Sequence, residues 1–200
     1  MIIPMINLAL FSSGNGTNAE NIINYFNNKG RKSGINVKVL FCNNPKAGVI
    51  ARARRLGVPV VVLSNEVMTL SHKDDTTLTD MLNFFKVNAV ILAGYLLKVP
   101  SLLIHIYPEK IINIHPALLP KYGGKGMYGH HVHEAVIAAG ERESGITIHL
   151  ADEVYDNGRV LFQAKCSIDT TDTPDTLAAK IHELEQANFP EVIERYFKKD

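Results

Sequence analysis

Tryptophan is absent from this 200-residue sequence, and cysteine is scarce. The only two cysteines, Cys42 and Cys166, lie far apart and form no Cys-x-x-Cys motif. This spacing gives no support to a thioredoxin-like redox site or a cysteine-ligated zinc site. We expect two reduced thiols on strands of a cytoplasmic protein, and a single disulfide between them stays open.

Long apolar runs and an excess of one charge are also missing. The longest hydrophobic runs have the length of a strand, so no membrane-spanning segment is predicted. The N-terminus has no basic region before its apolar residues, so no signal peptide is expected. A net charge of +1 without long Lys or Arg runs argues against an electrostatic nucleic-acid partner. Together with 46% hydrophobic and 20% charged residues, the length predicts one ordinary globular domain over residues 1–200.

Strand-like and helix-like segments alternate along the first 114 residues. This alternation predicts an α/β fold, a three-layer and mostly parallel open sheet of the Rossmann-like kind. Two further strand-like runs then flank an Asp156-Asn157-Gly158 turn, which predicts an antiparallel excursion. A long C-terminal helix should follow, with Thr173 as N-cap and Pro174 at its first position. The expected strands are 5–11, 37–42, 60–63, 88–93, 111–114, 145–150 and 160–166, and the expected helices are 19–28, 49–56, 76–85, 102–107, 131–139 and 175–197.

Residues 111–126 are the stretch with the clearest functional content. Ile111, Ile112 and Ile114 predict a buried strand, and Asn113 and His115 project from one face of it because side chains alternate along a strand. An amide and an imidazole at the end of an apolar strand need hydrogen-bond partners, which either the protein or a substrate supplies. A Gly-rich loop with Lys121 and Lys125 follows, and such loops at the carboxyl ends of strands bind ligands in open α/β sheets. These lysines are either a solvated pair or an anion contact.

A second Gly-rich loop, residues 13–18, joins the first expected strand to the first expected helix. Its glycines allow a tight turn, and the helix start offers free N–H groups to a phosphate. A dinucleotide site is disfavoured because Asn43 and Asn44 stand at the end of the second strand, where such sites have an Asp or Glu that binds the ribose. The loop also lacks a lysine, so it is not a Walker A motif. A ligand bearing one phosphate is the favoured interpretation, ahead of a plain strand–helix turn.

Two further groups of polar residues have competing explanations. Asp156 lies in good turn sequence, but a turn that folds back toward His115 would raise the pKa of that imidazole and hold its tautomer. A zinc site is suggested by His130, His131 and His133, together with His115 and His149, yet neither a His-Glu-x-x-His motif nor a cysteine pair supports it. Helix capping or a phosphate contact is favoured there, and no metal is expected.

The chain resembles the folate-dependent phosphoribosylglycinamide formyltransferases, enzymes of purine biosynthesis, nearly from end to end. The resemblance rests on the loop 13–18, on Leu92-Ala93-Gly94-Tyr95, on the run Asn113-Ile114-His115-Pro116-Ala117-Leu118-Leu119-Pro120, and on Tyr155-Asp156-Asn157-Gly158. It implies transfer of a formyl group from 10-formyltetrahydrofolate to the amine of glycinamide ribonucleotide. It also implies a phosphate-binding half at about 1–110 and a folate-binding, catalytic half at about 111–200.

The resemblance further assigns roles to particular positions. Asn113 and His115 would stabilise the oxyanion of the formyl group, His115 would donate a proton, and Asp156 would support His115. The ribonucleotide would be bound at its phosphate and amino ends by Gly16, Thr17, Asn18, Ala19, Glu20 and Glu185. The folate would be held by Asn113 and by the segments Leu96, Leu97, Lys98, Val99 and Asp152, Glu153, Val154, Tyr155, Asp156.

Two segments depart from the family pattern, and three other activities fit the same residues. The segment 96–99 departs from the Met-Arg-Ile-Leu type, and the loop 122–129 is longer than the usual Pro-Gly connection. A 10-formyltetrahydrofolate hydrolase, another folate-dependent formyltransferase and a non-catalytic nucleotide- or folate-binding module are the alternatives. Length and near-neutral charge favour the first assignment, acting on small molecules alone as a cytoplasmic monomer or homodimer.

Overall fold

The structure, a computed structural model, describes residues 5–70 and 76–198. One seven-stranded sheet runs through it in the order β3-β2-β1-β4-β5-β6-β7. Strands β1 to β5 are parallel to one another, whereas β6 pairs antiparallel with both β5 and β7. The strands are β1 (Ile6–Ser12), β2 (Ile35–Cys42), β3 (Val60–Val62), β4 (Ala89–Leu92), β5 (Ile111–His115), β6 (Glu143–Leu150) and β7 (Val160–Ser167).

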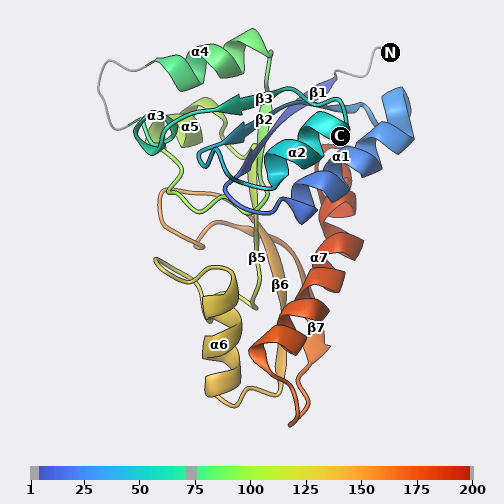
Figure 1. Ribbon diagram of the computed structural model, residues 1–200, viewed down its shortest axis with the longest axis vertical. Coiled ribbons are helices and arrows are strands. Elements are labelled where there is room, and N and C mark those ends of the chain that lie inside the picture. The colour runs from blue at the N-terminus through green and yellow to red at the C-terminus, as the bar shows by residue number, and fades with distance from the viewer. Residues whose placement is uncertain (1–4, 71–75, 199–200) are drawn as a thin grey trace.

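Helices cover both faces of this sheet, as Figure 1 shows. One apolar cluster includes buried residues of α1, α2, α6 and α7, and the other includes buried residues of α3, α4 and α5. The helices are α1 (Thr17–Lys29), α2 (Val49–Arg55), α3 (Asn65–Met68), α4 (Thr77–Phe84), α5 (Ser101–Ile106), α6 (His130–Ala138) and α7 (Pro174–Phe197), with a 3-10 turn at Gly30–Ser33. The predicted three-layer α/β fold with an antiparallel excursion and a long last helix is therefore confirmed.

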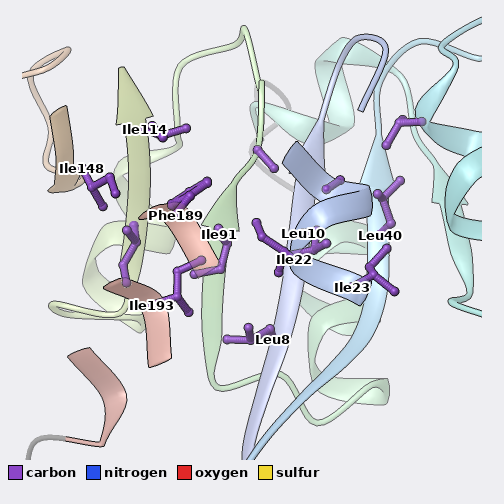
Figure 2. Close-up of a cluster of buried hydrophobic side chains, with 14 of the residues drawn as sticks. Leu8, Leu10, Ile22, Ile23, Leu40, Ile91, Ile114, Ile148, Phe189 and Ile193 are labelled. Atoms are coloured by element: carbon purple, nitrogen blue, oxygen red, sulfur yellow. The ribbon is translucent and has the colours of Figure 1, made fainter. Parts of the chain in front are cut away.

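The central strands are apolar on both faces because each face meets a helical layer. Leu8 and Leu10 of β1 point into the α1 and α7 side with Ile91 of β4, and Figure 2 shows them beside Ile22 of α1. Ala9 and Phe11 alternate with them and contact the opposite layer. All four β1 residues are fully buried, so this strand is the centre of both cores.

Helix α7 begins where the sequence predicts and runs without a break past its proline. The Thr173 hydroxyl accepts the Thr176 N–H, and the Thr176 side chain accepts the Thr173 N–H, which is a capping box. Pro190 lies inside the helix and is buried. The helix contacts α1, α6, β5, β6 and β7, so it holds the parallel and antiparallel parts of the sheet together.

Two elements were not predicted from sequence. The 3-10 turn at Gly30–Ser33 and the four-residue helix α3 are too short to show a hydrophobic period. Helix α3 is instead defined locally by Ser64, whose hydroxyl accepts the Val67 N–H. No helix in the described ranges is long and apolar enough to cross a bilayer.

The sheet order creates a crevice where β1 separates β2 from β4. Chain connections leave the sheet in opposite directions on the two sides of this point, so the loops after β1 and β4 diverge. The Gly-rich loop after β1 and the Gly94 turn after β4 both lie there, joined by a hydrogen bond from Ser13 N to the Gly94 carbonyl of 2.9 Å. The fold therefore places a ligand cleft at the carboxyl ends of β1, β4 and β5.

The burial of β5 predicts a stability difference between two isoleucines. Ile112 is fully buried in β5, so Ile112→Ala should lower the free energy of unfolding by about 2–5 kcal/mol. Ile106, which is 47% exposed on α5, provides the matched control, and Ile106→Ala should cost far less. Urea unfolding followed by circular dichroism measures both, and equal losses would contradict this packing.

Candidate active site

One large cavity of about 690 Å³ occupies the predicted cleft. Its lining combines the loop after β1, the segment after β4, the end of β5, the Gly-rich loop before α6, the loop between β6 and β7, and one turn of α7. Most of the sequence-predicted site residues line it, namely Gly16, Thr17, Asn18, Leu96, Leu97, Lys98, Val99, Asn113, His115, Asp152, Val154, Tyr155, Asp156 and Glu185.

Three predicted residues lie outside that lining. Ala19 is fully buried in the core, and Glu153 is more than half exposed at the surface. The carboxylate of Glu20 forms ion pairs with Arg52 and Arg55 and does not line the cavity. The Glu20 N–H also donates to the Gly16 carbonyl at 2.9 Å, so it is the first helical hydrogen bond of α1.

The loop at the start of α1 has the geometry of an anion site. Gly16 precedes the helix with a φ of 82°, and a Cβ placed there would lie 2.3 Å from the Val49 side chain. Only glycine fits this close approach of two backbones. The N–H groups of Thr17, Asn18 and Ala19 come before the first helical bond, at the positive end of a 13-residue helix.

Asn113 is held by a histidine on the neighbouring strand. In the antiparallel β5–β6 register Asn113 lies opposite His149, and Asn113 Nδ2 is 3.0 Å from His149 Nε2. His149 Nδ1 lies 2.8 Å from the Leu150 carbonyl, which can only accept, so Nδ1 carries the proton. In the neutral imidazole Nε2 is then the acceptor for Asn113, which leaves the second hydrogen of that amide available to a ligand. Asp156 Oδ1 lies 3.6 Å from the same nitrogen, so a protonated Nε2 would instead donate to that carboxylate.

His115 and Asp156 lie side by side although 40 residues separate them in the sequence. His115 Nδ1 is 3.6 Å from Asp156 Oδ2, and His115 Nε2 is 2.7 Å from the Tyr122 carbonyl. The Gly124 N–H donates to Asp156 Oδ2 at 2.8 Å. Asp156 itself has a φ of 55°, a left-handed conformation that Asp tolerates better than most residues. The turn therefore folds back onto the imidazole, as the sequence analysis proposed for a functional Asp156.

Asp156 raises the pKa of His115, as the sequence predicts, but the net direction is downward. Burial is the largest influence and lowers the pKa of His115 below its ordinary value, while the Asp156 carboxylate and the Tyr122 carbonyl oppose this only in part. The side chain is 4% exposed, so the cost of charging it outweighs the attraction. Burial would raise the pKa of Asp156, but His149, His115 and the Gly124 N–H lower it, and the net direction is downward. The pair is a neutral imidazole beside a carboxylate near pH 7.

Sequence reasoning missed several supporting groups. His149 entered only as a zinc candidate, yet within the described parts of the chain no cluster of three or more His, Cys, Asp or Glu can hold a metal ion. Thr147, two residues before it, bonds the Ala117 carbonyl at 2.7 Å and the Leu119 N–H at 3.0 Å, fixing the chain after β5. The spacing of two residues places Thr147 and His149 on one face of a strand, which the sequence could have shown. That this face meets Asn113 and His115 follows only from the β5–β6 register.

The arrangement can polarise a carbonyl group. Asn113 and His115 come from the same face of β5, and both side chains line the cavity. One amide N–H and one imidazole, with a carboxylate behind the imidazole, suit a reaction in which negative charge develops on an oxygen. The anion loop of α1 and the exposed Leu96 lie in the same cavity, so a phosphate-bearing ligand and an apolar one fit together.

Comparison with known proteins identifies the family. Residues 6–193 match the formyl transferase family. The phosphoribosylglycinamide formyltransferase of Bacillus subtilis (strain 168) is 33% identical over 191 residues, covering 96% of this chain and 94% of the relative. The crystal structure of phosphoribosylglycinamide formyltransferase from Bacillus halodurans superposes with a TM-score of 0.83 at 33% identity, over 96% of each chain. That from Streptococcus pneumoniae TIGR4 gives 0.84 at 33% identity, over 97% of this chain and 100% of the other.

The chain therefore belongs to the formyl transferase family. Within it, the relatives named above are all phosphoribosylglycinamide formyltransferases, so the resemblance seen in the sequence is confirmed. A chloroplastic member from Vigna unguiculata is 44% identical over 190 residues, covering 94% of this chain. The chain spans 59% of the length of that relative and 63% of its counterpart from Arabidopsis thaliana.

The His115–Asp156 geometry predicts a titration that does not depend on substrate. His115 should titrate below about 6.5, and Asp156→Asn should lower its pKa further because the neighbouring negative charge is lost. The unfolded state then binds more protons below pH 6.5, so His115 lowers stability as the pH falls through this range. Imidazole NMR signals measure the midpoint. Glu153→Gln is the control, since Glu153 lies near His105, and an unchanged midpoint in Asp156→Asn would contradict the pairing.

Proposed function

We propose that this chain transfers the formyl group of 10-formyltetrahydrofolate to the amine of glycinamide ribonucleotide. The observation that carries the proposal is the single cavity that joins an anion loop to the Asn113, His115 and Asp156 cluster. The family and its named relatives support the same reaction. Residues 1–110 would supply most of the phosphate site and residues 111–200 the folate site and the chemistry, within one domain.

The ribonucleotide would bind between α1 and α7. Its phosphate would take the N–H groups at Gly16, Thr17 and Asn18, while its amino group would approach Glu185 from α7. Burial raises the pKa of Glu185, and the Asn18 amide and His182 counter this. The backbone N–H of Ala19 would continue the phosphate site, whereas Glu20 would act from behind it through Arg52.

The folate would bind on the other side of the cavity. The segment Leu96–Val99 and most of the loop 152–156 line the cavity, and Leu96 is 48% exposed as an apolar surface. Asp152 shapes that loop because its carboxylate accepts the Val154 N–H at 2.7 Å and the Asn157 amide at 3.3 Å. Glu153 would contact the folate only at its exposed rim.

The reaction would begin with attack of the neutral amine on the formyl carbon. A new C–N bond forms, the carbonyl electrons move to oxygen, and the Asn113 Nδ2–H and His115 stabilise that oxyanion. Collapse breaks the bond between the formyl carbon and the folate nitrogen, which takes a proton as the amine loses one. Asp156 would relay the proton that the amine loses to His115 and would stabilise the imidazolium so formed. His115 would then donate a proton to the folate nitrogen and return to its neutral form, so its Nε2–H must leave the Tyr122 carbonyl during turnover.

The remaining expectations follow from this reaction. No step requires a metal, and the partners would be small molecules, with no nucleic acid or membrane, for a monomer or homodimer. A cytoplasmic location is the prediction for this chain, whereas the plant relatives are named chloroplastic.

A product assay separates transfer from hydrolysis. With 10-formyltetrahydrofolate, release of tetrahydrofolate should require glycinamide ribonucleotide, because the amine is the nucleophile. Release without it would indicate a hydrolase, and no release in either case would indicate a binding module. His115→Ala should lower kcat by about 100-fold or more. His131→Ala is the matched control, since His131 is exposed on α6, and it should retain turnover.

A second assay tests how the phosphate loop is held. Arg52 donates from Nε to the Asn15 carbonyl at 3.0 Å and binds Glu20, so it braces the loop from behind. Arg52→Ala should raise the KM for glycinamide ribonucleotide by roughly 3- to 10-fold and leave the KM for the folate unchanged. Arg54→Ala, at an exposed position of the same helix, is the control. Equal effects on both KM values would contradict a role at the phosphate.

A further inference from the structure

A polar junction between α1 and α7 lies behind the ribonucleotide end of the cavity. Asn18 Nδ2 donates to Glu185 Oε2 at 2.9 Å, and Gln186 Nε2 donates to Asn18 Oδ1 at 3.0 Å. Asn21 Nδ2 donates to the Gln186 backbone carbonyl at 2.8 Å. Asn18 and Glu185 line the cavity, whereas Gln186 and Asn21 do not. Two residues outside the site therefore hold two residues inside it.

Pro190 explains why the Gln186 carbonyl is available. In an α-helix this carbonyl would accept the N–H of the residue four positions later, which here is Pro190. Proline has no N–H, and its ring pushes that carbonyl away from the helix axis. Asn21 supplies the missing donor from α1, which fixes the position of α1 along α7. The proline thereby sets the place where Asn18 meets Glu185.

The hydrogen bonds of this junction form a chain in which Gln186 donates to Asn18 and Asn18 donates to Glu185. An ionised Glu185 only accepts hydrogen bonds, so Asn18 must turn its NH₂ group toward it. The Asn18 oxygen then faces α7 and needs a donor, which the Gln186 NH₂ group provides. A donor at position 186 therefore selects one of the two flipped orientations of the Asn18 amide.

We propose that Gln186 is a positioning residue for the amino end of the ribonucleotide, acting through Asn18 on Glu185. Gln186 keeps the Asn18 NH₂ group on Glu185, and Asn18 keeps that carboxylate aimed into the cavity as an acceptor for the substrate amine. Pro190 and Asn21 make this possible by holding Gln186 in register with Asn18. The proposal rests on the proposed function, because it assumes that Glu185 meets the amino group.

Two substitutions of similar shape distinguish orientation from packing. Gln186→Glu places an acceptor against the Asn18 oxygen, favours the flipped amide and turns an oxygen toward Glu185. It should raise the KM for glycinamide ribonucleotide roughly 10-fold. Gln186→Met only removes the donor and should raise this KM about 3-fold. The KM for 10-formyltetrahydrofolate should not change in either variant. If Gln186 served only to fill space, Gln186→Glu would resemble the wild type.

The pH dependence gives a second test. The Asn18 oxygen and the nearby Glu185 carboxylate would disfavour an ionised Glu at position 186 and raise its pKa. Once protonated it is again a donor, so the KM ratio of Gln186→Glu to wild type should fall toward 1 as the pH is lowered from 8 to 5. Gln186→Met should show no such recovery. Ala187→Glu, which adds the same charge at the exposed neighbouring position, is the control and should keep the wild-type KM. A constant ratio for Gln186→Glu, or an equal defect in Ala187→Glu, would overturn the proposal.

NMR of the unliganded protein separates failure of this proposal from failure of the proposed function. The side-chain NH₂ signals of Asn18 should shift in Gln186→Glu, because the amide leaves Glu185, and stay in place in Ala187→Glu. If the wild type does not use glycinamide ribonucleotide while the Asn18 signals still shift, the proposed function fails and the orienting role of Gln186 remains. Unmoved Asn18 signals in Gln186→Glu would overturn that role whatever the activity.

Discussion

The antiparallel pairing of β5 with β6 is the constraint on which the candidate site depends. Its register puts Asn113 opposite His149 and His115 opposite Thr147. His149 orients the Asn113 amide, and Thr147 fixes the chain that leaves β5. A shift of one residue would turn these side chains to the other face of the sheet, so the register determines which side chains reach the cavity. The parallel strands before β5 supply the crevice, and this one antiparallel pair supplies the oriented donors.

Helix α7 lies between the β5 end of the candidate site and the Gly-rich loop after β1. Its buried face packs on the sheet, as Phe189 and Ile193 show in Figure 2, while its polar face meets α1 near the cavity. The same helix therefore contributes to the stability of the core and to the position of Glu185. Pro190 would weaken an isolated helix, but here it leaves the Gln186 carbonyl free to accept a hydrogen bond from Asn21 of α1. The proline has a structural function that its position in the sequence alone does not show.

The sequence predicted most of the fold and most of the residues that line the cavity. Hydrophobic period and glycine positions located the strands, and Thr173-Pro174 located the start of α7 to the residue. The strand ends marked Asn113, His115 and the loop after β1 correctly as cavity residues. These signals are local, which is why they can be seen without a structure.

The features that were missed depend on contacts between distant segments. The role of His149 requires the β5–β6 register, and that of Gln186 requires the approach of α1 to α7. The direction of the His115 pKa depends on how deeply the imidazole is buried, which no motif states. Glu20 fits the pattern of a phosphate loop in sequence, yet two arginines from α2 bind its carboxylate in space.

The most direct test of this account is a crystal structure of the protein with glycinamide ribonucleotide and an unreactive 10-formyl folate analogue. The account predicts the formyl oxygen within hydrogen-bond distance of Asn113 Nδ2 and the His115 imidazole, with the substrate amine facing the formyl carbon. It also predicts the phosphate at the N–H groups of α1. A formyl group bound away from β5, with Asn113 and His115 still bonded only to the protein, would contradict it.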